Sequence, residues 1–198
     1  GCGVVGLAYL LLKRNICQGF GMDCNPELIA AAQNNTAKLG FSDRFVLHTG
    51  ELADTRFLEN LRMEASPVQL VMANPPWRLV GSGRLPATEA RRKALFGDKG
   101  TFPLFASAAS SLLEEDGRFA CIISPDRLQD MLAALDGVGL TPYLLQYIHK
   151  QKTSPATFVL IEARKGAHAK PSVAEPIALY GPERFFTLES LAFCPFLR

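Results

Sequence analysis

The chain has 198 residues, of which 48% are hydrophobic and 20% are charged, and its formal net charge is +2. This length can bury one sizeable core and favours a single domain over two. The composition excludes a disordered chain and a coiled coil, and the small net charge does not by itself demand a polyanionic partner.

No apolar run reaches the roughly 20 residues that a membrane span needs, because residues 4–12 are followed by Lys13 and Arg14. The start has neither the basic leader nor the cleavage site of a signal peptide. The five cysteines are widely spaced and include no C-x-x-C pair, which argues against a disulfide framework and a zinc site. We therefore expect a cytoplasmic protein without membrane association or metal, whose thiols are reduced and mostly buried; the oligomeric state stays open.

Predicted helices and strands alternate along the chain. Helices are expected over 4–14, 26–39, 55–61, 102–113 and 125–135, and strands over 16–23, 44–48, 68–73, 119–123, 140–148 and 156–163. The strand 68–73 is apolar apart from Gln69, as in a strand buried on both faces of a parallel sheet. This alternation predicts an α/β fold with a Rossmann-like, doubly wound, mostly parallel sheet and a C-terminal antiparallel hairpin.

The predicted organisation is one domain over residues 1–165 with a C-terminal extension packed on it. Within the domain, residues 78–100 form a basic loop insertion on the substrate side, and residues 166–198, which include four prolines, form an irregular extension. The first residues are of the kind that normally follows a buried strand. We therefore expect an N-terminally truncated piece from which the first strand of the sheet is missing.

A glycine-rich segment opens the chain. Residues 1–6 match the pattern G-x-G-x-x-G and precede a predicted helix. In such a loop, backbone N–H groups and the helix dipole can face a polar or anionic ligand, and glycine lets the ligand approach the backbone closely. The pattern alone is weak, because a tight strand–helix turn without any ligand would have the same sequence.

Carboxylates follow the next two predicted strands. Asp23 lies 20 residues after Gly3, where a carboxylate can accept hydrogen bonds from both ribose hydroxyls of a nucleoside. Alternatively, Asp23 caps the helix that begins at Pro26. Glu51 either contacts an adenine amine or is a solvated loop charge. The glycines and Asp23 together indicate a nucleoside cofactor, without separating S-adenosylmethionine from a dinucleotide.

The sequence Asn74-Pro75-Pro76-Trp77 directly follows the predicted strand 68–73. A primary aromatic amine is a poor nucleophile because its lone pair is delocalised, so an enzyme must favour a pyramidal nitrogen. The side-chain carbonyl of Asn74 can accept one amine N–H and the backbone carbonyl of Pro75 the other, while two prolines make the loop rigid. Trp77 offers a ring face to a base turned out of its stack. The alternative is a proline turn with Trp77 as core filler.

With these motifs the chain resembles class I S-adenosylmethionine-dependent methyltransferases that carry Asn-Pro-Pro followed by Tyr, Phe or Trp. This group includes adenine-N6, guanine-N2 and protein-glutamine methyltransferases. Residues 117–128 and 154–166 are similar to bacterial tRNA(Val) adenine-N6-methyltransferases. Trp77 stands where that subgroup usually has tyrosine, and the acidic residue and substrate segment expected before the glycine loop are absent.

The resemblance implies S-adenosylmethionine as the cofactor. The catalytic residues that it implies are Asn74, Pro75, Pro76 and Trp77. The cofactor-binding residues are Gly1, Cys2, Gly3, Asp23, Cys24, Glu51, Leu52 and Asn74.

Basic residues cluster beside the expected catalytic loop. Between residues 78 and 100, six basic side chains stand against two acidic ones. A second basic run near the hairpin comprises Lys150, Lys152, Arg164, Lys165 and Lys170. Together they could hold the backbone of a folded RNA, although any single one is as readily a solvated surface charge. The candidate RNA-binding residues are Arg78, Arg84, Arg91, Arg92 and Lys93.

The leading prediction is an S-adenosylmethionine-dependent methyltransferase acting on an exocyclic amine, adenine N6 in tRNA. The same loop could instead act on a protein glutamine amide or on guanine N2 of rRNA. A different class is a non-catalytic nucleotide-fold module that binds a partner. The glycines, Asp23 and Asn74 count against that alternative.

Overall fold

The computed structural model describes residues 2–13, 18–79, 88–166, 170–183 and 185–194. The elements in chain order are α1 (Cys2–Leu12), β1 (Gly19–Asp23), α2 (Pro26–Lys38), β2 (Phe45–Thr49), α3 (Thr55–Ala65), β3 (Leu70–Ala73), β4 (Arg78–Leu79), α4 (Glu89–Leu95), β5 (Phe96–Gly97), α5 (Thr101–Leu112), β6 (Arg118–Ile123), η1 (Pro125–Arg127), α6 (Leu128–Asp136), β7 (Leu140–Gln151), β8 (Ala156–Lys165), β9 (Ser172–Val173), β10 (Ile177–Tyr180) and α7 (Leu188–Phe193).

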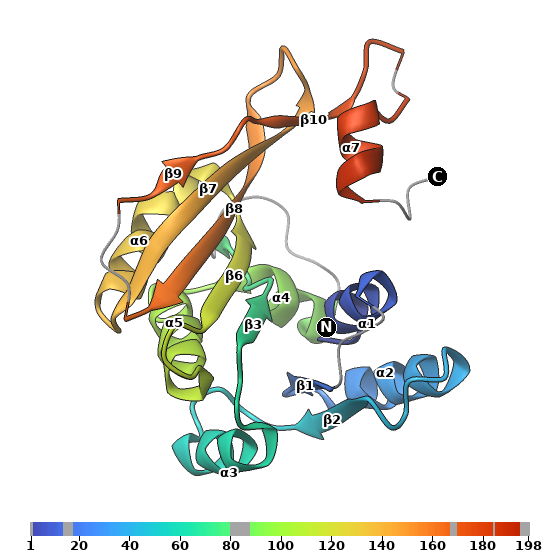
Figure 1. Ribbon diagram of the computed structural model, residues 1–198, viewed down its shortest axis with the longest axis vertical. Helices are drawn as coiled ribbons and strands as arrows, with labels where there is room; N and C mark the ends of the chain where they lie inside the picture. Colours follow the sequence, from blue (N-terminus) through green and yellow to red (C-terminus); the bar gives the residue numbers. More distant parts are fainter. Residues whose placement is uncertain (1, 14–17, 80–87, 167–169, 184, 195–198) are drawn as a thin grey trace.

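The larger sheet has the strand order β10-β7-β8-β6-β3, and β9 also pairs with β7. β3 is parallel to β6 and β10 is parallel to β7, whereas β8 runs antiparallel to both of its neighbours. The carboxyl ends of β3, β6, β7 and β10 therefore lie at one edge of the sheet. Helices α5 and α6 pack together on one face (Figure 1).

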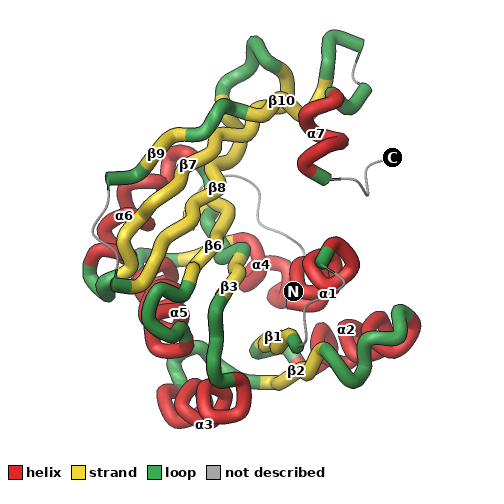
Figure 2. Tube along the Cα trace, in the orientation of Figure 1, coloured by secondary structure: helices red, strands yellow, loops and turns green. Residues whose placement is uncertain are grey.

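β1 and β2 form a separate parallel pair next to α1 and α2 (Figure 2). Within the described residues, β1 pairs with β2 alone and β3 with β6 alone, and β4 and β5 form a third, two-stranded sheet. The alternating elements, the parallel pairs and the β7–β8 hairpin confirm the predicted α/β class. All four residues of β3 are only half-buried because β3 is the outermost strand on one side of the larger sheet. The prediction of a strand buried on both faces is therefore wrong.

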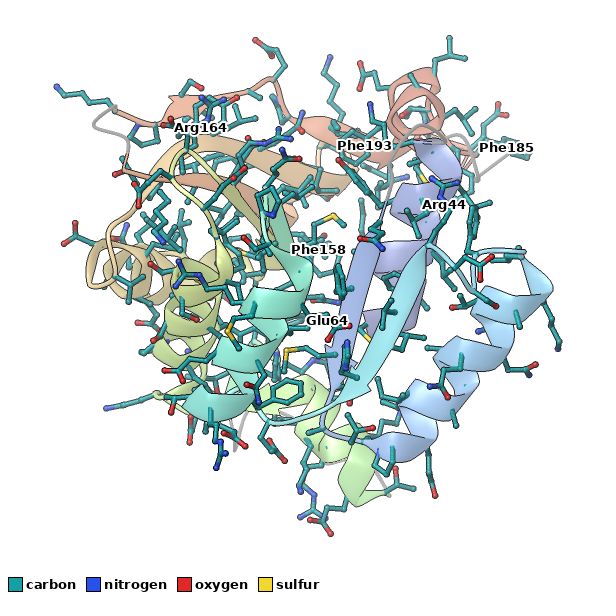
Figure 3. All side chains as sticks on the ribbon, turned by 60° about the horizontal axis from the view of Figure 1, so that its bottom comes forward. Arg44, Glu64, Phe158, Arg164, Phe185 and Phe193 are labelled. Atoms are coloured by element: carbon teal, nitrogen blue, oxygen red, sulfur yellow. The ribbon has the colours of Figure 1, made fainter. Side chains whose placement is uncertain are left out.

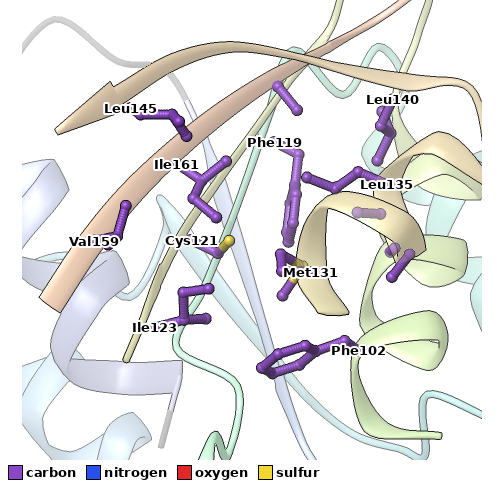
Figure 4. Packing of buried hydrophobic residues seen from close by; sticks show 14 of the residues in the cluster. Phe102, Phe119, Cys121, Ile123, Met131, Leu135, Leu140, Leu145, Val159 and Ile161 are labelled. Carbon is purple, nitrogen blue, oxygen red and sulfur yellow. The ribbon is translucent and has the colours of Figure 1, made fainter. Parts of the chain in front are cut away.

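The main core lies between the larger sheet and helices α5 and α6 (Figure 4). Along β6, Phe119, Cys121 and Ile123 are buried and alternate with more exposed residues, as the two-residue period of a strand requires. Burial raises the pKa of the Cys121 thiol to about 12. The described cysteines are all free thiols, but only Cys121 is buried and Cys24 is exposed, so the expectation of mostly buried thiols is wrong for them.

Helix α2 begins and ends where its local sequence predicts. The side chain of Asn25 accepts a hydrogen bond from the Glu27 N–H, Pro26 occupies the first turn and Lys38 the last. Asp23 was the alternative cap, but its Oδ1 instead accepts a hydrogen bond from the Asn25 N–H at 2.9 Å. The cap of α2 is therefore Asn25, and Asp23 orders the turn that precedes it.

Two segments expected to be irregular contain regular structure. The insertion 78–100 contains α4, which Thr88 caps. Its short strands β4 and β5 pair in parallel, so the end of the insertion lies beside its first residues. The C-terminal extension adds β9 and β10 along the outer edge of β7, and the Ser190 hydroxyl of α7 donates to the Leu179 carbonyl of β10. An unpaired edge strand attracts backbone partners, which explains why this proline-containing tail becomes ordered as strand.

Candidate active site

Three strand ends carry the residues singled out from the sequence. Asp23, the last residue of β1, pairs in register with Thr49, the last residue of β2, and its carbonyl accepts the Gly50 N–H at 3.1 Å. Glu51 therefore follows directly at the edge where β1 ends. Asp23 is half-buried and Glu51 is exposed. Neighbouring carboxylates at the carboxyl ends of parallel strands suit a nucleoside that donates hydroxyl and amine hydrogen bonds.

The glycines of the first segment allow neighbouring elements to pack closely. The sequence pattern alone could not distinguish this packing role from a role in ligand binding. Gly3 and Gly6 lie inside α1, and a Cβ atom on Gly3 would stand 2.6 Å from the Cβ of Ala32 in α2. A Cβ atom on Gly6 would stand 2.3 Å from the ring of Phe45 in β2. Both glycines thus let α1 approach its neighbours, and Gly1 lies outside the described residues.

The N-terminal end of α1 nevertheless lies next to β1. The Cys2 sulfur is 3.2 Å from the position that a Cβ atom on Gly21 would take, two residues before Asp23. Cys2 is half-buried, and burial raises the pKa of its thiol above the ordinary value. Leu52 is half-buried and Cys24 exposed. The described cofactor candidates outside the Asn74 loop therefore gather near the ends of β1 and β2.

The segment Asn74–Trp77 leaves β3 at its carboxyl end. Asn74 is exposed, whereas Pro75 is fully buried and Pro76 is half-buried. The backbone of Gly97 in β5 packs closely against the loop. A Cβ atom on Gly97 would stand 2.5 Å from the Pro76 carbonyl oxygen, so a larger residue would not fit there. The geometry thus presents the Asn74 side chain to solvent on a loop that is anchored immediately after it.

Trp77 combines the two interpretations made from the sequence. Its ring packs against the main core and meets the Phe158 ring edge-on, with the centroids 6.0 Å apart and an interplanar angle of 74°. The Arg78 guanidinium lies over the Trp77 ring, 5.3 Å from its centroid. Trp77 is therefore partly core, and a stacked base would share its ring with Arg78.

Sequence reasoning missed the role of Arg127, whose Nη1 donates to the Trp77 carbonyl at 3.0 Å. The two residues are 50 positions apart and meet because β3 and β6 are parallel neighbours with Ala73 beside Cys121. From the sequence, residues 124–127 indicate only a family similarity. The one signal that could have found Arg127 is that a basic residue stands shortly after a strand end.

The basic residues divide into several groups. Arg91, Arg92 and Lys93 of α4 are exposed, and Lys93 is 3.9 Å from Glu89 on the same helix. Arg84 lies outside the described residues.

The second basic run is not one surface. β8 runs antiparallel to β7, so Lys150 and Lys152 lie at the edge where β3 ends, while Arg164 and Lys165 lie at the opposite edge. Figure 3 shows Arg164 well apart from Phe158 of the same strand. The Lys165 ammonium donates at 2.8 Å to the carbonyls of Ser110 and Leu113, at the end of α5. Lys165 thus caps a helix, and the prediction of one RNA cradle from this run is wrong.

Over the residues placed in the structure, no helix has the length and apolarity to cross a membrane. The same residues contain no group of three or more His, Cys, Asp or Glu side chains arranged to hold a metal ion.

Solved structures define the class of fold. A protein described as a predicted O-methyltransferase from Agrobacterium tumefaciens matches with a TM-score of 0.65 and 19% identity, over 90% of this chain and 75% of that one. An O-methyltransferase family 2 protein from Planctomyces limnophilus matches with a TM-score of 0.55 and 16% identity, over 83% of this chain and 48% of that one. The chain therefore has the fold of class I S-adenosylmethionine-dependent methyltransferases.

Sequence comparison leads to a narrower group. Two curated proteins from strains of Porphyromonas gingivalis, both named tRNA1(Val) (adenine(37)-N6)-methyltransferase, are 32% identical to this chain over 130 residues. The match covers 64% of this chain and 49% of each relative, so the chain spans about half the length of the curated relatives it matches. This similarity confirms the resemblance seen in the motifs. No protein-family model matches the chain.

Proposed function

We propose that this chain is the catalytic part of an S-adenosylmethionine-dependent methyltransferase that acts on an exocyclic amine, adenine N6 in tRNA. The observation that carries this proposal is the loop after β3, in which Asn74 is exposed while Pro75 is fully buried. A polar acceptor on a rigid, buried anchor at the carboxyl end of a parallel strand is preorganised for one substrate group.

The donors and acceptors present fit the cofactor. Asp23 and Glu51 would accept hydrogen bonds from its nucleoside part, beside the N-terminal end of α1. When bound, S-adenosylmethionine supplies an electrophilic methyl group. The chain's own contribution is to bind the target amine through the side-chain carbonyl of the exposed Asn74 and to hold it in line, whereas the fully buried Pro75 serves as the anchor of the loop. No strong general base is needed, because the nitrogen becomes acidic as it is alkylated and its proton can leave to water.

Aromatic and basic groups beside the loop favour a nucleobase over a glutamine side chain. Trp77 and Phe158 form an aromatic corner, and Arg78 adds a cation over the Trp77 ring. The exposed basic residues of α4 belong to the same insertion and suit phosphate contacts. The relatives from Porphyromonas gingivalis are named for adenine N6 of a tRNA, and with a tRNA substrate we propose a cytoplasmic protein.

A methyl-transfer assay tests this proposal. The protein is incubated with S-adenosylmethionine labelled in the methyl group and, separately, with tRNA, rRNA, DNA and protein. We expect label in tRNA, which nuclease digestion should release as N6-methyladenosine. If the label is found in protein glutamine or on guanine N2, that group and not adenine N6 is the target. Binding of the cofactor by calorimetry without transfer to any pool would point to a non-catalytic module.

The basic residues of α4 give a separate prediction. Replacing Arg91, Arg92 and Lys93 together by alanine should weaken RNA binding and reduce the salt slope, by about 0.7–0.9 for each phosphate that is no longer neutralised. A matched control replaces three exposed basic residues of α2 and α3, Lys38, Arg56 and Arg62. Affinity is measured by fluorescence anisotropy between low and physiological salt. Equal affinity and slope in the α4 variant and the wild type would contradict RNA binding by this helix.

A further inference from the structure

We propose that Arg127 is a positioning residue that holds the Asn74–Trp77 loop in its active shape. The catalytic consequence rests on the proposed function, whereas the effect on the loop does not depend on it. Arg127 lies in η1, directly after β6, and its guanidinium reaches the carbonyl at the end of the loop.

Arg127 is buried with only 6% of its surface exposed, and among the described residues no other charged side chain is buried. A buried guanidinium is costly unless it is paired and hydrogen-bonded. Its Nε donates to Asp130 Oδ2 at 2.7 Å, its Nη1 donates to the Trp77 carbonyl at 3.0 Å, and its Cζ lies 4.4 Å from the centre of the Phe102 ring. These contacts set the guanidinium in one orientation.

The loop depends on such an outside donor because of its own composition. Pro75 and Pro76 have no N–H group, so the loop has few backbone donors with which to secure itself. Its carbonyls must be secured by donors from elsewhere or be left for the substrate. By donating to the Trp77 carbonyl, Arg127 secures the end of the loop.

The position of the Trp77 ring follows from the same contact. Arg127 holds the backbone on one side of Trp77, Phe158 meets the ring edge-on, and Gly97 backs the Pro76 carbonyl. Removing the guanidinium releases one of these supports without touching Asn74. A shift of about 1 Å in a catalytic group can lower a rate by roughly a hundredfold.

Lysine is the informative substitution at this site. Arg127→Lys keeps the positive charge, but one ammonium cannot reproduce the planar fork that joins Asp130 to the Trp77 carbonyl. Arg127→Met keeps the approximate length without a donor. Arg118→Lys is the matched control, since Arg118 forms an ion pair with Glu162 of β8 at 3.5 Å but is more exposed and lies at the start of β6, at the opposite edge of the sheet from the loop.

Two measurements on the full chain test the proposal. The sequence contains one tryptophan, so ¹⁹F NMR of 5-fluorotryptophan-labelled protein reports on Trp77 alone. We expect Arg127→Lys to shift or broaden the Trp77 resonance and to lower the single-turnover rate about 10- to 100-fold. The affinity for S-adenosylmethionine should change by less than about threefold, and Arg118→Lys should resemble the wild type in every respect.

The outcomes are separable. A Trp77 resonance and a turnover rate that both stay at wild-type values in Arg127→Lys would overturn the positioning role. A wild-type protein without methyl transfer would refute the proposed function, and the Trp77 resonance alone would then decide the role of Arg127. If Arg127→Lys does not fold, Asp130→Asn decides instead, because the Asp130 side chain is 59% exposed and the change is mild. In that variant the resonance must still move, and an unchanged one overturns the proposal.

Discussion

Replacing Asn74 with alanine should lower the rate of methyl transfer by about 100- to 1,000-fold, the usual cost of losing one preorganised polar group at a reacting centre. Asn74 is exposed, so the substitution leaves the packing of the core intact, and the thermal stability of the protein should stay nearly unchanged. Single-turnover transfer of the labelled methyl group to tRNA measures the rate. Calorimetry with S-adenosylmethionine measures binding separately, and the affinity should fall far less than the rate.

Two further variants make this result specific to the Asn74 carbonyl. Asn34→Ala is the matched control, since Asn34 is exposed on α2 and should leave the rate unchanged. Asn74→Asp keeps an acceptor oxygen and should lose less activity than Asn74→Ala. A rate in Asn74→Ala within about threefold of the wild type would contradict the mechanism that we derive from this loop.

Truncating Phe119 to alanine should reduce the free energy of unfolding by about 3–5 kcal/mol. Phe119 is fully buried in the main core, between the larger sheet and helices α5 and α6, so the change leaves a cavity there (Figure 4). The measurement is urea unfolding followed by circular dichroism, with the midpoint and slope fitted together.

Phe185→Ala is the matched control for this prediction. Phe185 is 73% exposed and lies at the outer border of the molecule in Figure 3, so its loss should change stability by less than about 0.5 kcal/mol. Similar losses in both variants would mean that the cluster around Phe119 is not the principal core.

Local sequence signals predicted the longer helices and strands up to residue 165 with errors at their ends, but they missed the short elements of the insertion 78–100 and of the C-terminal extension. Asn25 and Pro26 start α2 through contacts within one turn, and such contacts are readable from neighbouring residues. Helix α1 ends at Leu12 rather than at residue 14, and α3 continues to Ala65 rather than stopping at residue 61. The ends differ because helix termini are decided by packing as much as by propensity.

Contacts between distant segments could not be read in this way. The glycine pattern was compatible with a ligand loop and with close packing, and only the positions of Ala32 and Phe45 show that Gly3 and Gly6 serve packing. Likewise, Lys165 looked like part of a basic surface until its partners at the end of α5 were known. In each case the deciding atoms are distant in the sequence.

The sequence by itself determined the α/β alternation and the loop Asn74–Trp77, because hydrophobic period, caps and two successive prolines act over a few residues. Only the tertiary structure decided which groups meet at that loop. The parallel pairing of β3 with β6 brings Arg127 to the Trp77 carbonyl, and the antiparallel direction of β8 places Lys150 and Lys165 at opposite edges of the sheet. Strand order and direction result from the packing of the whole core, and no short segment encodes them.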